Sequence, residues 1–538
     1  MGRGEMQPTV FLALWAVAAY IIYLAISSFV ASRNAARKAR DWGCKPAPNF
    51  NRGDRFGIYN VRMLLKADKE KRLPDYSQER VADLSQSEGR LVTTMRNTIA
   101  GEESFFTIEP KNIQAVLATQ FKDFGFGPRR NGNFEPLLGH GIFASDGKQW
   151  EHSRALLRPQ FAREQISDLK LEEEHVQNML KAIPLNADGW TDIFDIQTLF
   201  FRLTIDSATE FLFGGSVDSQ LNALPNYSSG RGEVPPERDE RLFAYAFDKS
   251  QWYLARASRF GSKYWLAHTP DFKKQCREVH AFVDHFVQLA LNKEKKELER
   301  TAGGKKEKYV FLDALAAQTR DPIQLRDQLL NILLAGRDTT ASLLSWLFRL
   351  LAQHPDKFDK LRNAVLQEFG PYESDPSDIS FARLKGCSYL QHTLNETLRL
   401  YPVVPMNGRR AEVDTTLPLG GGPDGKSPVF IKAGTEVGYS VHVMQRRTDI
   451  WGADAAEFRP ERWEGKKVGW EYLPFNGGPR ICIGQQFALT EASYVVVRLL
   501  QRFDSLEGIG MDGAVKHGLT LTSCPGEGVK VKLRVAKA

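Results

Sequence analysis

The sequence predicts a mainly α protein with small β-sheets, in which one transmembrane helix precedes one large body. Three observations predict this class. An apolar segment without charged residues covers residues 9–31. The strongest helical signals lie over about residues 322–354 and 388–400, and each ends near a proline. Short β-rich pieces alternate with glycine and proline between about residues 415 and 441, which is typical of small sheets built from hairpins.

The apolar segment is long enough to cross a membrane. Its 23 residues would form a helix of about 34 Å, whereas the hydrocarbon core of a bilayer is about 30 Å thick. The apolar region of a cleaved signal peptide is shorter, about 7–15 residues. The sequence therefore predicts an uncleaved anchor at residues 9–31.

The charges on either side of the anchor predict its orientation. Before the anchor, Arg3 is offset by Glu5. The basic residues that follow it are Arg33, Arg37, Lys38, Arg40 and Lys45. Because an excess of Lys and Arg marks the cytoplasmic flank, we expect the body of the protein in the cytosol. The predicted organisation is a lumenal N-terminus (1–8), the anchor (9–31), a basic linker with two prolines (32–48) and one cytosolic domain (49–538).

Composition excludes several classes of protein. Hydrophobic residues make up 42% and charged residues 25% of the chain, which excludes wholesale disorder, collagen and a polytopic membrane bundle. The net charge of +7 is too small, and its basic residues too mixed with acidic ones, to indicate nucleic-acid binding. Five cysteines, an odd number without a C-x-x-C pair, argue against a disulfide framework or a structural zinc module.

One segment imitates a phosphate-binding loop. Residues 420–427, GGGPDGKS, satisfy the pattern G-x-x-x-x-G-K-[ST]. Such a loop works by leaving a strand and opening a helix, whose N-terminal N–H groups hold the phosphate. Here Pro428 follows at once, and residues 429–431, VFI, are typical of a strand. The sequence therefore favours the tip of a hairpin.

The segment that indicates chemistry runs from Phe475 to Ala488, FNGGPRICIGQQFA. Its single cysteine, Cys482, lies among glycines and is followed by an apolar helical stretch. The N–H groups at the start of a helix could favour a thiolate there. A small buried cysteine after a turn is the alternative interpretation of this segment taken alone.

This segment resembles the haem-binding signature of the cytochrome P-450 family, F-x-x-G-x-R-x-C-x-G. Its fixed places are filled by Phe475, Gly478, Arg480, Cys482 and Gly484. Three further motifs of that family follow the expected order: an oxygen-activation motif at 335–340 (AGRDTT), an ExxR motif at 396–399 (ETLR) and a PER motif at 460–462. The resemblance covers about residues 45–535 and implies the cytochrome P-450 fold, an α-rich triangular prism with a β-rich lobe.

The resemblance implies a b-type haem held by the sulfur of a cysteine. Cys482 would be the axial ligand of the iron, and a thiolate ligand favours O–O cleavage. The cofactor-binding residues that the resemblance implies are Trp150, Arg154, Arg409, Phe475, Arg480 and Cys482. The arginines would bind the haem propionates. Arg410 is adjacent to Arg409, and strand alternation lets only one of the two face the haem, so either assignment stays open here.

The resemblance also assigns catalytic and structural residues. Asp338 and Thr339 lie inside the long predicted helix, where both residue types are poor helix formers. Thr339 would donate a hydrogen bond to bound O₂, and Asp338 would relay protons. Glu396 and Arg399 share one helix face, which by itself is compatible with a weak surface ion pair. The resemblance implies instead a buried structural triad that they form with Arg462.

Longer blocks are similar to the fungal group that hydroxylates n-alkanes and fatty acids at terminal or near-terminal carbons. These blocks are residues 115–127, 141–161, 333–346 and 446–452. The similarity implies O₂ as co-substrate, electrons from NADPH through a separate reductase, cytochrome b5 as a further electron donor, and the endoplasmic reticulum membrane as the location. Glu151 departs from the basic residue expected on the helix that faces the reductase.

Other functions of a haem-thiolate protein remain as alternatives. A monooxygenase of this kind could act on a sterol, a xenobiotic or a secondary metabolite. A peroxide isomerase or dehydratase would need neither O₂ nor a reductase, and a haem sensor would catalyse nothing. The pair Asp338–Thr339 argues against the last two, because neither needs residues for proton delivery.

Overall fold

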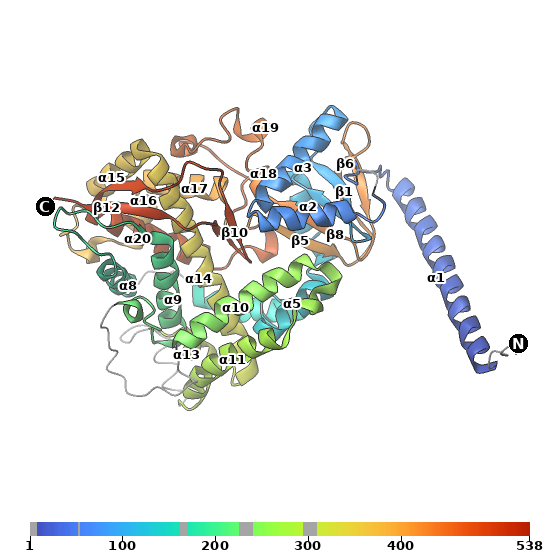
Figure 1. Cartoon of the computed structure of the whole chain (residues 1–538), viewed down its shortest axis with the longest axis horizontal. Coiled ribbons are helices and arrows are strands. Elements are labelled where there is room, and N and C mark those ends of the chain that lie inside the picture. The colour runs from blue at the N-terminus through green and yellow to red at the C-terminus, as the bar shows by residue number, and fades with distance from the viewer. Residues whose placement is uncertain (1–7, 52–53, 162–168, 225–239, 294–308, 538) are drawn as a thin grey trace, which may run out of the picture.

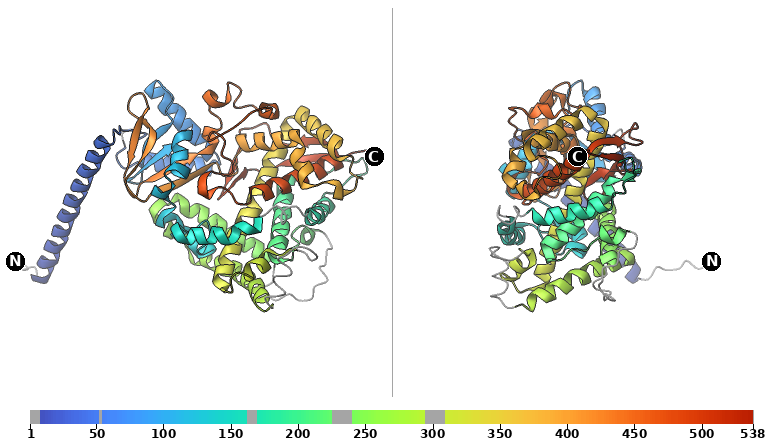
Figure 2. Two further views of the ribbon diagram at one scale, coloured as in Figure 1. Left: turned by 180° about the vertical axis from the view of Figure 1, so that it is seen from behind. Right: turned by 90° about the vertical axis from the view of Figure 1, so that its left-hand side faces the viewer.

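The computed structural model describes residues 8–51, 54–161, 169–224, 240–293 and 309–537. Helix α1 (Pro8–Asp41) projects from the body of the protein, as Figure 1 and the left view of Figure 2 show. Its part from Phe11 to Asp41 has a mean hydropathy of 2.0 at its most apolar, and none of that apolar stretch is buried. These properties suggest membrane anchoring. Near the end of the helix, Lys38 pairs with Asp414 of the body at 2.6 Å. The helix continues past the predicted anchor, so residues 32–41 of the predicted linker are helical, and the prolines follow its end.

The body is rich in helices. Its helices are α2 (Ile58–Lys69), α3 (Leu73–Glu88), α4 (Pro110–Gln114), α5 (Gly127–Leu138), α6 (Gly147–Leu157), α8 (Lys170–Lys181), α9 (Ile196–Phe213), α10 (Glu240–Arg259), α11 (Pro270–Leu291), α13 (Phe311–Ala316), α14 (Pro322–Gln353), α15 (Pro355–Phe369), α16 (Phe381–Gly386), α17 (Ser388–Leu400), α18 (Val441–Met444), α19 (Thr448–Trp451) and α20 (Gln485–Arg502). The two long helical signals of the sequence correspond to α14 and α17.

Within the described residues, four small sheets complete the body. Their strands are β1 (Thr94–Ile99), β2 (Glu102–Thr107), β3 (Phe124–Gly125), β4 (Phe194–Asp195), β5 (Met406–Ala411), β6 (Thr415–Gly421), β7 (Ser427–Ile431), β8 (Glu436–Ser440), β9 (Phe503–Gly508), β10 (His517–Leu519), β11 (Ser523–Pro525) and β12 (Lys530–Val535). The largest sheet has the order β1-β2-β8-β5-β3. Figure 1 shows its blue and orange strands side by side in a lobe at one end of the body. The predicted class, mainly α with small sheets, is confirmed.

The segment that imitates a phosphate-binding loop is a hairpin. Strands β6 and β7 pair antiparallel, with Gly421 opposite Ser427, so the residues between them form the tip. No helix follows the lysine and serine of the motif; β7 does. The structure thus confirms the hairpin interpretation.

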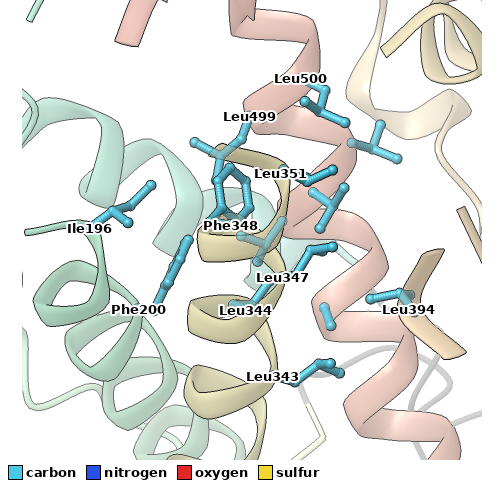
Figure 3. Packing of buried hydrophobic residues seen from close by; sticks show 14 of the residues in the cluster. Ile196, Phe200, Leu343, Leu344, Leu347, Phe348, Leu351, Leu394, Leu499 and Leu500 are labelled. Atoms are coloured by element: carbon cyan, nitrogen blue, oxygen red, sulfur yellow. The ribbon is translucent and has the colours of Figure 1, made fainter. Parts of the chain in front are cut away.

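Helix α14 crosses the centre of the body and buries most of its side chains. Figure 3 shows Leu344, Leu347, Phe348 and Leu351 of α14 between α9 and α20. The rings of Phe348 and Phe200 on α9 lie 5.2 Å apart. Tight packing along most of its length holds this helix of 32 residues in place, so the polar residues in its middle have fixed positions.

Candidate active site

A cavity of about 740 Å³ lies inside the body. Its volume falls in the usual range for small-molecule sites. Its wall includes residues 335–336 and 338–340 of α14 on one side, and residues 473–476 and 480–484 before α20 on another. The oxygen-activation motif and the haem-binding signature, which lie far apart along the chain, therefore line the same cavity.

Cys482 lies in this wall, between a 3-10 turn at Gly478–Arg480 and the start of α20. The accessible surface of the Cys482 side chain faces the cavity, where protein surrounds it. This burial within the protein raises the pKa of the Cys482 thiol. The backbone N–H of Gly484 and the charge of Arg154 oppose that rise. A coordinating metal ion deprotonates a thiol outright, so the site supplies a ligand that a metal would convert into a thiolate.

The turn before Cys482 has room only for glycine. Gly478 has φ +68°, and a Cβ built on it would lie 1.9 Å from the carbonyl oxygen of Leu117. On the other side, the Cys482 N–H donates to the carbonyl of Phe475 at 3.0 Å. The path of the cysteine loop is thus fixed at both ends.

Several arginines line the same cavity, and four of them lie around the rings of Phe126 and Trp150; we call these four, Arg130, Arg154, Arg409 and Arg480, the cavity arginines. Arg480 Nη2 donates to Asp146 Oδ1 at 2.8 Å, while its Nε and Nη1 are buried without a hydrogen-bond partner. Burial and the neighbouring charges of Arg409 and Arg154 lower the pKa of Arg480 to about 9. The pKa of Arg130 is likewise lowered to about 9.

The cavity arginines surround two aromatic rings. The guanidinium of Arg480 lies 4.2 Å from the ring centre of Phe126 and 4.3 Å from that of Trp150. Arg130 and Arg409 lie 3.9 and 4.7 Å from Phe126. These rings hold the guanidinium groups in place without neutralising them.

The donor set fits haem. Buried cations with unused N–H groups need an anion with several acceptor oxygens, and haem carries two propionates. The thiol of Cys482 lines the same cavity and is a suitable ligand for the iron. The propionates and the iron of haem would therefore each have suitable partners in this cavity, the arginines for the propionates and Cys482 for the iron.

The two predicted catalytic residues lie on α14 at the cavity wall. Thr339 Oγ1 donates to the Ala335 carbonyl at 2.7 Å. Asp338 is buried, and burial raises its pKa to about 6, although Arg337 Nη1 at 3.2 Å counteracts the rise. Arg337 also pairs with Asp248 on α10. A carboxyl with this pKa can both hold and release a proton near neutral pH.

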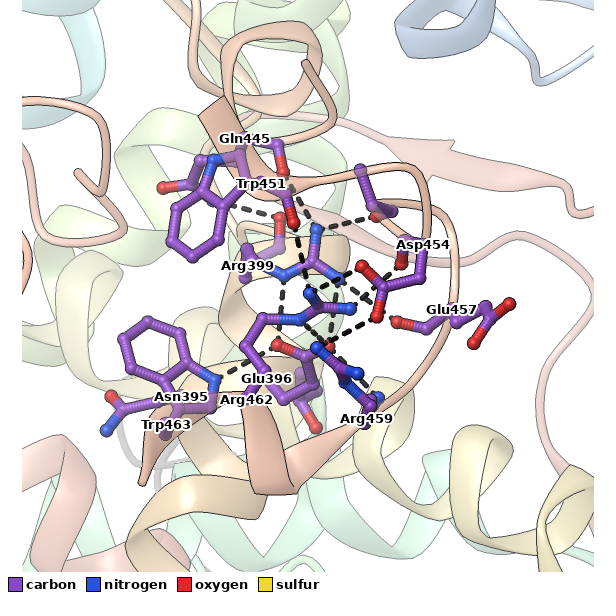
Figure 4. A network of polar contacts seen from close by, with 12 residues as sticks. Asn395, Glu396, Arg399, Gln445, Trp451, Asp454, Glu457, Arg459, Arg462 and Trp463 are labelled. Carbon is purple, nitrogen blue, oxygen red and sulfur yellow. Dashed lines mark hydrogen bonds and ion pairs between the residues drawn. The ribbon is translucent and has the colours of Figure 1, made fainter. Parts of the chain in front are cut away.

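The predicted triad lies outside the cavity wall, in a buried network of polar contacts (Figure 4). Glu396 and Arg399 are fully buried on α17, with Arg399 Nη2 at 2.8 Å from Glu396 Oε1. Arg462 Nε lies 3.0 Å from the same oxygen, and Trp463 Nε1 donates to Glu396 Oε2 at 3.0 Å. The weak surface ion pair is excluded, because no member is exposed.

The network reaches the cysteine loop through one glutamine. Arg399 Nη1 donates to the Gln445 carbonyl at 2.9 Å, and Gln445 Oε1 accepts from the Leu473 N–H at 2.8 Å. Leu473 lies two residues before Phe475, whose carbonyl holds Cys482. The network is therefore connected by hydrogen bonds to the loop that carries the thiol.

Comparison with known proteins identifies the family. The family model for cytochrome P450 matches residues 71–509, which is most of the chain. The chain belongs to the cytochrome P-450 family.

Relatives of this P-450 cover nearly its whole length. It is 54% identical to cytochrome P-450 monooxygenase g430 of a Fusarium species, over 96% of this chain and 90% of that protein. It is 45% identical to cytochrome P-450 52A13 of Debaryomyces hansenii, over 98% and 99%, and 50% identical to cytochrome P-450 52A5 of Candida maltosa, over 84% of each. These relatives confirm the prediction of a monooxygenase. They also confirm the similarity to the fungal hydroxylase group that the sequence blocks indicated. Membership implies a haem-thiolate cofactor, and the family in general uses a redox partner.

In this P-450, the structure shows which of the two candidate strand arginines lines the cavity, and it identifies one further cavity residue, Arg130. Arg409 is 2% exposed and lines the cavity, whereas Arg410, its neighbour on β5, is half-buried and outside the wall. Arg130 on α5 was missed by sequence reasoning. Its only sequence signal is that two consecutive arginines, Arg129 and Arg130, follow the block at 115–127 after one proline, Pro128.

Proposed function

We propose that this P-450 hydroxylates long-chain aliphatic substrates, n-alkanes or fatty acids, at a terminal or near-terminal carbon. It uses O₂ and takes electrons from NADPH through a separate reductase, with cytochrome b5 as a further donor. The observation that carries the proposal is a cavity with a largely apolar wall, which has Cys482 at one side and the pair Asp338–Thr339 at another. The similarity to the fungal hydroxylase group supports the substrate class.

In this proposal the cofactor-binding residues contact different parts of the haem. Cys482 would hold the haem iron through its sulfur, and the bound haem would supply oxygen activation. Trp150 and Phe475 line the haem space, and Arg154, Arg409 and Arg480 bind its propionates, with Arg130 added to them. Glu396, Arg399 and Arg462 keep the cysteine loop in shape without touching the cofactor.

Asp338 and Thr339 are the proposed catalytic residues. Thr339 places its hydroxyl at the cavity wall by bonding back to the helix, where it orients oxygen. Asp338 delivers protons, drawing on its raised pKa and on its contact with Arg337. The acidic side chain of Asp248 is 57% exposed, so the chain Asp248–Arg337–Asp338 reaches solvent.

The protein is further proposed to be a single-pass protein of the endoplasmic reticulum membrane. Residues 1–8 would be lumenal, residues 9–31 the anchor, residues 32–48 the connection and residues 49–538 the cytosolic catalytic domain. The exposed apolar side chains of α1 and the basic residues near its end support this topology. A location at the bilayer also suits substrates that partition into it.

A ligand series tests the substrate class. The purified full-length haem protein is titrated with fatty acids, alkanes, sterols and small aromatics, and binding is read from the shift in haem absorption. Reconstitution with a reductase and NADPH then measures hydroxylated product. Binding of long aliphatic chains with NADPH-dependent product supports the proposal, whereas binding of sterols or small aromatics without aliphatic chains overturns it.

Replacing Thr339 by alanine is expected to uncouple electron use from hydroxylation. Loss of the hydroxyl removes the group that orients oxygen, so product per NADPH should fall about tenfold or more while NADPH consumption continues and hydrogen peroxide is released. The conservative variant Thr339→Ser keeps the hydroxyl and should remain coupled. Unchanged product per NADPH in Thr339→Ala would remove Thr339 from the mechanism.

A further inference from the structure

Arg80 is a buried cation in the cavity wall that none of the roles above uses. It lies on α3, where Leu73, Ser77 and Arg80 all line the cavity. Their spacing of four and three residues places them on one face of the helix. Arg80 is 5% exposed, so its charge has left bulk water.

In the described part of the chain, no carboxylate pairs with Arg80. Its Nη2 donates to Asn97 Oδ1, and its Nε is buried without a hydrogen-bond partner. Aromatic rings surround the rest, with Phe50 and Phe106 at 4.7 and 5.9 Å from the guanidinium carbon. Burial lowers the pKa of Arg80 to about 10, and the nearby Tyr76 hydroxyl only partly opposes this. A buried charge of this kind is costly unless an anion joins it.

The surroundings of Arg80 indicate what kind of anion. Asn97 and Ser104 are register partners on β1 and β2, and both line the cavity beside Arg80. The nearby wall includes the apolar residues Leu64, Ile99, Phe105 and Phe106. One carboxylate also lines it, that of Glu436, the register partner of Ser104 on β8, and the charges it interacts with are those of Arg129 and Arg410 rather than that of Arg80. A small polar site within an apolar wall matches an amphiphile that has one charged end and a long hydrocarbon chain.

This site is separate from the cavity arginines. Those four contact Phe126, Trp150, Asn407 and Asp146, whereas Arg80 contacts Phe50, Tyr76, Asn97 and Phe106. The two propionates of haem can satisfy cations around Phe126. The haem propionates would therefore not neutralise the charge of Arg80, which is available to a different anion.

We propose that Arg80, supported by Asn97, binds the carboxylate of the substrate, and that this P-450 therefore prefers long-chain fatty acids to n-alkanes. The inference rests on the proposed function and narrows its substrate class. A carboxylate offers two oxygens to the fork of an arginine, whereas an alkane leaves that charge buried and unpaired. Fixing the carboxylate at α3 leaves the methyl end of the chain as the free end, so oxidation falls at or near that end.

Matched ligands test the inference on the full-length haem protein. Hexadecanoic acid and n-hexadecane have the same chain length and differ in the carboxylate, and both are titrated by the shift in haem absorption. In Arg80→Gln, the Kd for the acid should rise about 10- to 100-fold, while the Kd for the alkane should not rise. Asn97→Asp leaves the arginine in place but supplies an internal carboxylate to it, so the acid should again bind more weakly.

Arg129→Gln is the matched control. Arg129 also lines the cavity, but it donates to the Ser258 carbonyl and belongs to neither site, so the Kd for the acid should change less than about threefold. An unaltered spectrum of the reduced carbon monoxide complex shows that each variant is folded and loaded with haem.

The outcomes separate this inference from the proposed function. If the wild-type protein binds both ligands and Arg80→Gln changes neither Kd, the subsite is wrong and the proposed function stands. If Arg80→Gln weakens both ligands equally, Arg80 is structural. If the wild-type protein binds neither ligand, the proposed function fails and this inference fails with it.

Discussion

Replacing Cys482 by histidine is expected to abolish hydroxylation and to remove the strongly red-shifted Soret band of the reduced carbon monoxide complex. The sulfur of Cys482 is the thiol at the cavity wall next to the start of α20. A histidine nitrogen gives haem a different electronic character that does not favour O–O cleavage. The measurement is an absorption spectrum of the dithionite-reduced protein with and without carbon monoxide, followed by an assay of product.

The control for this variant is Cys44→Ser. Cys44 is half-buried near the end of α1, where its thiol lies 3.9 Å from the Trp42 carbonyl. That variant should keep the wild-type spectrum and activity. A red-shifted band in Cys482→His, or its loss in Cys44→Ser, would show that the ligand is assigned to the wrong cysteine.

Replacing Arg399 by alanine is expected to prevent haem incorporation, rather than to slow the chemistry. Arg399 is fully buried and bonds the carboxylate of Glu396 as well as the carbonyls of Gln445 and Ala455. Its removal leaves the Glu396 charge short of a partner, which costs about 3–5 kcal/mol in a buried network. It also cuts the link through Gln445 to the cysteine loop. The measurements are the haem content per polypeptide and the yield of soluble protein.

Arg459→Ala is the matched control, because it removes an arginine from the same region. The side chain of Arg459 is 50% exposed and pairs with Asp454 at 2.9 Å, a type of pair worth about 1 kcal/mol or less. We expect that variant to bind a normal amount of haem. Soluble Arg399→Ala protein with normal haem content would disprove the structural role of the network.

Local pattern was sufficient to predict the long helices and most of the site. Helix α14 begins at Pro322, and the side chain of Asp321 caps it by accepting from the N–H groups of Ile323 and Gln324. Pro355 begins the next helix, so local residue types indicate both ends of α14. Cys482, Arg480, Asp338 and Thr339 belong to short motifs whose spacing is their signal. All four line the one cavity.

The rest depends on contacts between distant segments. Strand β2 pairs in parallel with β8, more than 300 residues further along the chain, and β4 pairs with β12 near the C-terminus. Hydrophobic periodicity does not say which strands will meet. Arg130 and Arg80 were missed for the same reason, since an arginine on a helix is ordinarily solvated. Only the assembled wall shows that Arg80 is buried and that Arg130 is half-buried at the cavity.

The order of synthesis gives the cavity a further property. Its wall is built from residues between Leu64 and Thr522, and the sheet beside it joins residues 94–107 to residues 406–440. Helix α1 precedes all of them in the chain, so a growing polypeptide presents its apolar helix to a membrane long before the wall can close. In the proposed topology, haem therefore enters a chain that is already tethered, and its site is complete only after nearly the whole polypeptide has been synthesised.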